Sequence, residues 1–330
     1  MDASSRTPRL LVIGPSNIGD AILMSEVIAQ LHARYPQGHL ALVVGERACL
    51  LFADDPRIHS LVDFSAFDSA IGRLRLAWAL WRYQPHVVVD LRHTAYPLLL
   101  KPLSAWRYLL QPPRTMTHMR DRYQWRLAAQ VPACASRLPM GEGGPLHFTE
   151  RDVAQVEALW KRWQVESGGR LVVVCPGARS HIKRWTAEGF ARVADRLVAE
   201  AGARILFSGE PSEEPVIEEI LALMDRPARS AVGLLTIRQL GLVMRRAALV
   251  LTNDSASLHL ASALDVPTVA IFGPTDDGVY GPTASRSRIV RRALFCAPCR
   301  RSLCRFNHEC MRFIGPDEVY DAAVKVLQRQ

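Results

Sequence analysis

Three loops of the sequence place charged side chains at points where a predicted strand gives way to a predicted helix. GPSNIGD, residues 14–20, ends in Asp20. PGARSHIKRW, residues 176–185, contains Lys183, and TNDSASLHLASAL, residues 252–264, contains Asp254. A carboxylate suits the removal of a proton from a hydroxyl, whereas a lysine ammonium suits a phosphate. The residue types therefore predict a general base in the first loop and a phosphate site in the second.

Each of these assignments has a structural alternative. Asp20 could equally cap the helix that follows it, because aspartate is favoured at helix starts. Lys183, taken with its neighbours Arg179, His181 and Arg184, could belong to a solvated basic loop.

In the third loop, Asp254 or Ser255 is expected to cap a helix whose N-terminal amides favour an anionic leaving group. His259 lies four residues after Ser255 and could be a ligand contact or a packed core histidine. A further loop, LFSGEPSEEP at 206–215, offers carboxylates that could accept both hydroxyls of a ribose or cap the helix that starts near Ser212.

Short β-rich runs alternate with helical patterns along the chain, which predicts an α/β protein with parallel sheets covered by helices. Glycine-rich stretches at 141–144 and 167–169 bracket a predicted helix over 149–163, and a fresh strand begins at Leu171. We therefore expect two Rossmann-like domains, 1–165 and 166–330, facing a central cleft. Sites in such sheets lie outside the carboxyl ends of the strands.

The composition narrows the functional classes. With 41 Lys and Arg against 32 Asp and Glu, the net charge is +9, which favours anionic partners. No nucleic-acid-binding motif is present, so nucleic acid is not an expected partner. Neither GxxxxGK[ST] nor a full GxGxxG follows a strand, so P-loop hydrolysis and standard dinucleotide binding lose support. The apolar runs are too short to span a bilayer, and the start, MDASSRTPRLL, lacks a long apolar leader, which predicts a cytoplasmic location.

Five segments in order carry a resemblance that covers nearly the whole chain: SNIGDAIL, PGARSHIKRWTAEGF, SGEPSEE, NDSASLHLASAL and FGPTDDGVYGP. The sequence resembles the ADP-heptose:lipopolysaccharide heptosyltransferase family, glycosyltransferase family 9. The resemblance implies a GT-B fold and an inverting transfer of heptose from ADP-heptose to the lipopolysaccharide inner core. It makes Asp20 the base and Lys183 the cation on the diphosphate. It also implies that Glu213 contacts the donor ribose or adenine and that Asp254 grips the donor sugar and phosphate, with no cofactor required for catalysis.

Basic residues of the first domain indicate the acceptor side. Arg92, Arg120 and Arg122 belong to a cluster suited to a phosphorylated, lipid-anchored core oligosaccharide, or to a solvated basic face. The segment IGRLRLAWALWRY, 71–83, combines tryptophans with arginines and suits peripheral docking on the anionic inner face of the inner membrane. A helix that faces the core is the favoured interpretation of the same pattern.

Four cysteines, Cys296, Cys299, Cys304 and Cys310, form a C-x2-C-x4-C-x5-C array within segment 296–310. Disulfides are disfavoured in a reducing cytoplasm, so a structural zinc or iron–sulfur site is the sharper hypothesis. The wider second pair argues against it, and no catalytic step needs the metal.

Other functions stay open at this point. A different nucleotide-sugar transferase or a nucleotide-sugar 2-epimerase would share two facing Rossmann-like domains, because a fold does not fix a function. A metal-binding or redox module built on the four cysteines is the alternative from another class.

Overall fold

The computed structural model describes residues 7–135, 144–163, 169–299, 301 and 303–328, and it divides into two compact units, 1–149 and 150–330. The predicted boundary between residues 165 and 166 differs from this division and lies outside the described residues. The physical reason is helix α7 (Glu150–Arg162), which packs against α10 (Ile237–Met244) of the second unit. Arg238 Nε donates to Asp152 Oδ2 at 2.8 Å, and this ion pair is almost fully buried.

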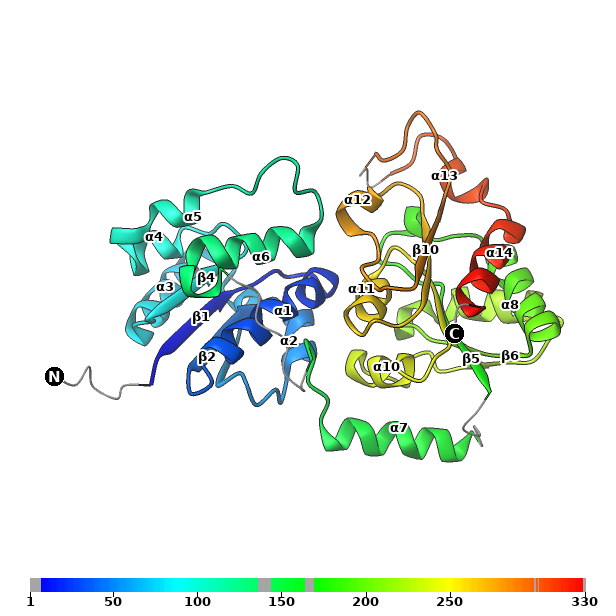
Figure 1. Cartoon of the computed structure of the whole chain (residues 1–330), viewed down its shortest axis with the longest axis horizontal. Helices are drawn as coiled ribbons and strands as arrows, with labels where there is room; N and C mark the ends of the chain where they lie inside the picture. The colour runs from blue at the N-terminus through cyan, green and yellow to red at the C-terminus, as the bar shows by residue number, and fades with distance from the viewer. Residues whose placement is uncertain (1–6, 136–143, 164–168, 300, 302, 329–330) are drawn as a thin grey trace. The chain divides into compact units, whose positions relative to one another are not determined.

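The first unit is built on a parallel sheet in the order β3-β2-β1-β4, covered by helices (Figure 1). Its strands are β1 (Arg9–Ile13), β2 (His39–Val44), β3 (Ser60–Asp63) and β4 (Val87–Asp90). Its helices are α1 (Ile18–Arg34), α2 (Glu46–Phe52), α3 (Ala70–Tyr83), α4 (Tyr96–Leu100), α5 (Trp106–Leu109) and α6 (Met119–Gln130), with 3-10 turns η1 (Phe64–Phe67), η2 (Pro102–Ser104) and η3 (Pro132–Cys134).

The second unit repeats the plan with a six-stranded parallel sheet in the order β10-β9-β8-β5-β6-β7. Its strands are β5 (Arg170–Cys175), β6 (Ala203–Phe207), β7 (Ala228–Ser230), β8 (Leu249–Asn253), β9 (Thr268–Phe272) and β10 (Ser287–Arg291). The remaining helices are α8 (Ala187–Ala201), α9 (Glu214–Leu223), α11 (Ala256–Ala263), α12 (Asp277–Tyr280), α13 (Glu309–Arg312) and α14 (Pro316–Leu327), with 3-10 turns η4 (His181–Lys183) and η5 (Pro211–Glu213).

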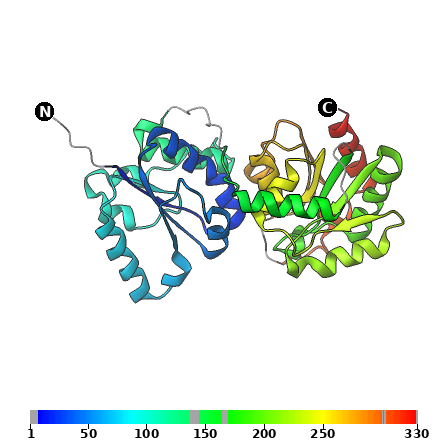
Figure 2. The ribbon, with the colours of Figure 1, turned by 90° about the horizontal axis from the view of Figure 1, so that it is seen from below.

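Continuous apolar runs explain why these strands lie inside helical layers. In β5, every residue from Leu171 to Cys175 is buried, as expected for a parallel strand covered on both faces. Helix α8 begins after Thr186, whose hydroxyl accepts a hydrogen bond from Gly189 N at 3.1 Å, and it ends at Gly202 in the left-handed conformation. Figure 2 shows this unit from below, with α7 running along it.

Chain order and spatial order reverse at one point in each sheet. In the first unit β1 lies between β2 and β4, and in the second β5 lies between β6 and β8. Ligands of open α/β sheets bind outside the carboxyl ends of the strands at such switch points. The topology therefore selects the loops after β1 and β4, and after β5 and β8. None of the helices that the structure describes is long and apolar enough to cross a membrane.

Candidate functional site

In the second unit, the loops after β5 and β8 are joined by one buried side chain. Asn253, at the end of β8, donates from Nδ2 to the carbonyl of Pro176 at 2.6 Å and accepts from the backbone N–H of Trp185 at 3.2 Å. Trp185 is itself anchored, because its indole Nε1 donates to the carbonyl of Ile314 at 3.1 Å. PGARSHIKRW is therefore fixed at both ends and is not a loosely solvated loop.

Lys183 and Asp254 form the charged centre of this site. Lys183 Nζ lies 2.7 Å from Asp254 Oδ2, with the lysine side chain 33% exposed and the aspartate side chain 5% exposed. The buried carboxylate holds the ammonium at the switch point, and the exposed part of the ammonium can meet an anion there. An ammonium has three donors, so Lys183 can keep its hydrogen bond to Asp254 and still donate one to a phosphate oxygen.

Ser255 occupies the N-cap position of α11 but makes no capping hydrogen bond to the helix; its Oγ lies 3.3 Å from Thr252 Oγ1. The predicted helix start is confirmed, and its amides face the site formed by the end of β8. His259 is only 6% exposed, and its ring lies 6.1 Å from that of Tyr280. This position favours the packing interpretation of His259 over a donor contact.

Glu213 reaches back from η5 toward the end of β5. One carboxylate oxygen, Oε2, accepts from Glu210 N at 2.9 Å, which closes a capping box, so the capping interpretation of this loop is confirmed. The same carboxylate lies directly over Gly177, where an added Cβ would stand 2.0 Å from Glu213 Cδ and Oε1. At Gly209 an added Cβ would stand 2.8 Å from Oε2. The absence of a Cβ atom at Gly177 and at Gly209 therefore leaves the space that this carboxylate occupies beside the Lys183 loop.

In the first unit, the GPSNIGD loop is tightly packed at the end of β1. Gly14 N donates to the carbonyl of Val43 at 2.8 Å, and a Cβ at Gly45 would stand 2.9 Å from the Cα of Ser16. Helix α1 begins at Ile18 with Asn17 as its N-cap, so Asp20 lies inside the first turn and is not the capping residue. Its half-buried carboxylate lies where the helix dipole favours negative charge.

The neighbouring strand β4 brings a cationic cluster to the same edge of the sheet, because Ile13 of β1 pairs with Asp90 of β4. Asp90 accepts from the backbone N–H groups of Arg92 and Thr94, and burial raises its pKa. Arg126, only 6% exposed, donates from Nη1 to the carbonyl of Leu91 at 2.7 Å. Burial, and then the charge of Arg126, lowers the pKa of His93.

The three predicted acceptor residues are differently placed around this edge. Arg122 is half-buried on α6 and lies close enough to Arg126 and His93 to repel their positive charges. Arg120 forms an ion pair with Glu26 of α1, so it bridges two helices. Arg92 is exposed and its guanidinium lies 3.7 Å from the centre of the Phe64 ring. A fully solvated basic face does not describe these residues.

Arg92 also lines a cavity of about 800 Å³ at the carboxyl ends of β1 and β2. Arg73 is the other arginine of its wall, and Ile13 and Val43 form part of its lining. One carboxylate, Asp68, also lines the cavity and acts electrostatically on Arg92, so it offsets part of the positive charge. The rest of the wall is largely apolar and comes from η1, α3 and α4: Phe64, Phe67, Leu74, Leu76, Ala77, Tyr96 and Leu99. Such a cavity can hold a ligand with an apolar part and an anionic group.

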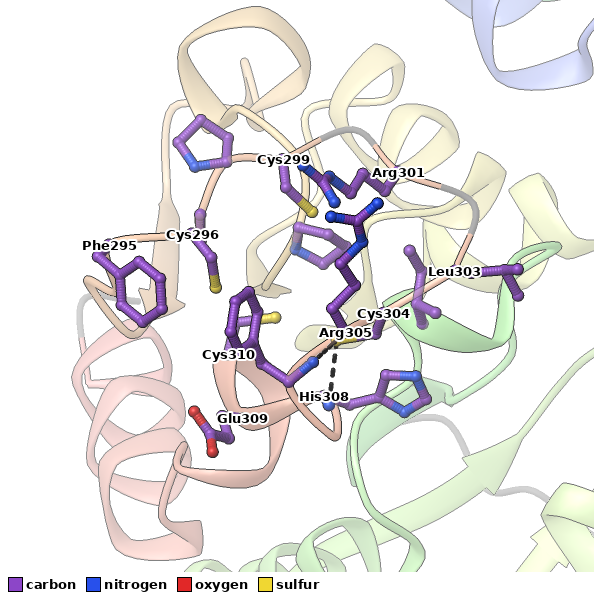
Figure 3. Close-up of a pocket in the computed structure, with 15 residues that line it drawn as sticks. Phe295, Cys296, Cys299, Arg301, Leu303, Cys304, Arg305, His308, Glu309 and Cys310 are labelled. Carbon is purple, nitrogen blue, oxygen red and sulfur yellow. Dashed lines mark hydrogen bonds between the residues drawn. The ribbon is translucent and has the colours of Figure 1, made fainter.

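The four cysteines line one cavity of about 410 Å³ in the second unit (Figure 3). Burial, and then the nearby thiols of the other three, raises the pKa of Cys310 to about 11. Cys304 Sγ accepts from the backbone N–H groups of Phe306 and His308, both at 3.3 Å. Hydrogen bonds of this kind stabilise a thiolate and are common around metal-bound sulfur.

Whether the four cysteines bind a metal is not decided by their arrangement in this cavity. Among the described residues, no group of three or more His, Cys, Asp and Glu side chains could hold a metal ion. Metal ligation by the array therefore stays a prediction. The segment contacts the Lys183 loop and the loop after β9: the His181 and His308 rings lie 5.4 Å apart, and Cys299 N donates to the carbonyl of Pro274 at 2.9 Å.

Some residues of the site received no role from the sequence. Asn253 was visible only as the neighbour of Asp254, and Gly177 only as a turn glycine. Asn253 gains its role from a contact 77 residues away along the chain, and Gly177 from a carboxylate 36 residues away. A polar residue directly at a predicted strand end was the one signal available for Asn253.

Comparisons with known proteins agree with this arrangement. The model of glycosyltransferase family 9 (heptosyltransferase) matches residues 136–309, more than half of the chain. Lipopolysaccharide heptosyltransferase 2 of Salmonella typhimurium is 26% identical over 317 residues, covering 86% of this chain and 88% of that protein.

Two solved structures share the fold. A family 9 glycosyltransferase from Veillonella parvula has a TM-score of 0.81 at 21% identity, with all of both chains covered. The E. coli ADP-heptose lipopolysaccharide heptosyltransferase II has a TM-score of 0.73 at 22% identity, covering 97% of this chain and 99% of that one. The predicted GT-B class is confirmed, and the chain belongs to glycosyltransferase family 9, the heptosyltransferases.

Proposed function

We propose that this glycosyltransferase moves a heptose from ADP-heptose to the inner core of lipopolysaccharide, with inversion at the anomeric carbon. The observation that carries the proposal is the gathering of Lys183, Glu213 and Asp254 by the loops after β5, β6 and β8. A cation, a helix N-terminus and a carboxylate at one switch point suit a nucleoside diphosphate. The printed names of the relatives support the choice of heptose and lipopolysaccharide.

The reaction is a single displacement. The Asp20 carboxylate takes the proton of an acceptor hydroxyl as the hydroxyl oxygen bonds to the anomeric carbon of the donor. The bond between that carbon and the phosphate oxygen breaks on the opposite face, and ADP leaves as an anion. Lys183 and the first amides of α11 stabilise the negative charge that develops on the phosphate. Because these groups already supply positive charge, we propose that catalysis needs no cofactor.

The donor and acceptor contacts divide between the two units. In the second, Glu213 accepts hydrogen bonds from the ribose hydroxyls, and Asp254 both orients Lys183 and contacts the sugar. In the first, Arg92, Arg120 and Arg122 meet the phosphates of a lipid-anchored core oligosaccharide. The buried Arg126 adds to the positive charge of this region.

Two measurements test the proposal. Calorimetric titration of ADP-heptose, ADP, UDP and GDP, with and without EDTA, should give selective binding of the adenine nucleotides that survives EDTA. A preference for UDP or GDP over ADP would contradict the assignment of ADP-heptose as the donor. In a transfer assay with heptose-deficient lipopolysaccharide, Asp20→Asn should lower kcat by about 10²- to 10⁴-fold with ADP affinity retained. The exposed Asp225→Asn is the matched control, and unchanged transfer by Asp20→Asn would refute its role as base.

A further inference from the structure

Helix α3 has two apolar faces, and only one of them is used by the fold. Gly72, Leu76 and Leu80 are buried, and the two leucines pack into the core of the first sheet. Ile71, Leu74, Trp78 and Trp81 follow the 3-4-3 spacing of a helical stripe on the other side, and each is 58 to 71% exposed. The interpretation of this helix as purely core-facing is therefore wrong for its two tryptophans.

The next elements of the chain extend this exposed apolar surface. Helices α3, α4 and α5 lie in the first unit (Figure 1), where α4 packs against α3. The 3-10 turn η2 contacts both α4 and α5. Of the 19 large apolar side chains that are exposed in the described part of the chain, 10 fall within residues 71–110. We name these ten the α3–α5 surface: Ile71, Leu74, Trp78, Trp81, Leu98, Leu99, Leu103, Trp106, Leu109 and Leu110.

The charges around the α3–α5 surface are predominantly positive. Residues 70–119 contain seven Lys and Arg: Arg73, Arg75, Arg82, Arg92, Lys101, Arg107 and Arg114. The same segment contains a single acidic residue, Asp90, which is 1% exposed. Two of the arginines lie over exposed tryptophans, Arg82 at 5.1 Å from the Trp78 ring and Arg107 at 5.4 Å from the Trp106 ring. Asp68, just before α3, is an exposed carboxylate at the border of this surface, beside Arg73 and Arg92 in the cavity wall. The surface thus presents aromatic and aliphatic groups with an excess of cations.

This combination fits one occupant better than the others. Tryptophan, leucine and arginine on one exposed face are typical of segments that lie in the interface of a bilayer with anionic lipids. A second copy of the chain in a two-fold dimer would place the same cations against each other, which opposes self-association. We propose that the α3–α5 surface docks this enzyme on the surface of a bilayer that contains anionic phospholipid.

The surface also leads toward the site of the first unit. Leu74 and Leu99 belong both to the α3–α5 surface and to the lining of the 800 Å³ cavity at the carboxyl ends of β1 and β2. An amphiphile held in the bilayer would therefore meet an apolar wall that continues toward Arg92. Docking goes beyond the transfer reaction, because it depends on neither the donor nor the acceptor.

The test is co-sedimentation of the whole protein with phosphatidylcholine vesicles that contain either no anionic lipid or about 30% phosphatidylglycerol. We expect binding to the anionic vesicles that weakens with added salt. Trp78→Ser with Trp81→Ser should lower the partition constant by about tenfold or more, and Arg75→Gln with Arg82→Gln by about fivefold for each arginine. None of these four residues lines the cavity. The matched control is Leu223→Ser with Leu234→Ser, two exposed leucines of the second unit.

Each outcome decides the proposal. Equal partitioning of the wild type and the tryptophan variant, or no wild-type binding to anionic vesicles, would overturn it. Sedimentation velocity separates the competing occupant: a wild-type oligomer that the tryptophan variant abolishes would make the surface a contact between copies. Transfer to a water-soluble, delipidated acceptor should be unchanged in the variants. A loss there, with vesicle binding intact, would contradict the proposal and place the tryptophans in the acceptor site.

Discussion

Replacing Gly177 by alanine should weaken adenine-nucleotide binding while leaving the stability of the fold nearly unchanged. The new Cβ would stand 2.0 Å from Glu213 Cδ and Oε1 and 2.3 Å from Oε2, whereas real Cβ contacts essentially never fall below 3.0 Å. The carboxylate must therefore move by about 1 Å, the difference between 3.0 and 2.0 Å. It is the far end of a flexible side chain, so it can move without disturbing β5.

The expected energies follow from that displacement. A shift of 1 Å breaks the 2.9 Å hydrogen bond from Glu210 N to Glu213 Oε2, at a cost of about 1 kcal/mol. The reduced freedom of alanine in the unfolded chain offsets roughly 0.4–1 kcal/mol of this. The free energy of unfolding should thus stay within about 1 kcal/mol. Losing charge-assisted hydrogen bonds to the ribose removes about 1.5–3 kcal/mol of binding, roughly a 10- to 100-fold rise in Kd.

Calorimetric titration with ADP and chemical denaturation measure the two effects separately. Gly315→Ala is the matched control, because its Cβ meets nothing within 4 Å and its φ is −76°. In a double-mutant cycle, Gly177→Ala should have little further effect on ADP affinity once Glu213 is replaced by alanine. Additive losses, or unchanged affinity in Gly177→Ala, would refute the idea that this glycine acts by seating the carboxylate.

Three further predictions concern other parts of the chain. Lys183→Met leaves the buried Asp254 without its cation, so the free energy of unfolding should fall by about 1–3 kcal/mol. The affinity for ADP should fall at least tenfold, whereas Lys161→Met, the control, should leave it unchanged. Unchanged ADP affinity in Lys183→Met would exclude this lysine from the phosphate site. Burial raises the pKa of Asp90 above its usual 3.8, so the folded chain keeps this proton to a higher pH than the unfolded chain does. In denaturation curves, the stability of the wild type relative to Asp90→Asn should therefore fall as the pH rises above 3.8. A rise in that relative stability would contradict the shift. For the predicted metal, protein purified under reducing conditions should contain about one equivalent of zinc or an iron–sulfur cluster by elemental analysis. Chelation of the metal, or the substitution Cys304→Ser, should lower Tm. Metal-free protein whose Tm does not change after chelation would refute the hypothesis.

Local patterns were enough to predict the elements that position the site. The strand predicted to begin at Leu171 and the helix predicted over 149–163 both agree with the structure to within one residue. Each depends on a short-range pattern, a continuous apolar run in the strand and a helical periodicity in the helix. The loops that carry Lys183 and Asp254 follow directly from predicted strand ends, so their proximity could be expected from the topology of parallel sheets.

The details of the site depend on contacts between residues far apart in sequence. Nothing near Gly177 reveals that a carboxylate will rest on it, and nothing near Asn253 reveals that it will hold the loop at Pro176. The domain boundary shows the same limit. The glycine-rich stretch after residue 163 looked like the division, but the buried pair of Asp152 and Arg238 joins α7 to the second unit.

The α3 segment shows why an apolar pattern alone cannot assign a face. Leu76 and Leu80 form one stripe, and Leu74, Trp78 and Trp81 form another, so either stripe satisfies the rule that an apolar face is buried. Leu76 and Leu80 pack into the apolar core of the sheet with residues such as Leu11 and Val88. On the same side, Gly72 lies against the 3-10 turn η1, where an added Cβ would stand 2.9 Å from the backbone of Phe67. The inner side of the helix is therefore closely packed, and the tryptophans lie on the opposite face.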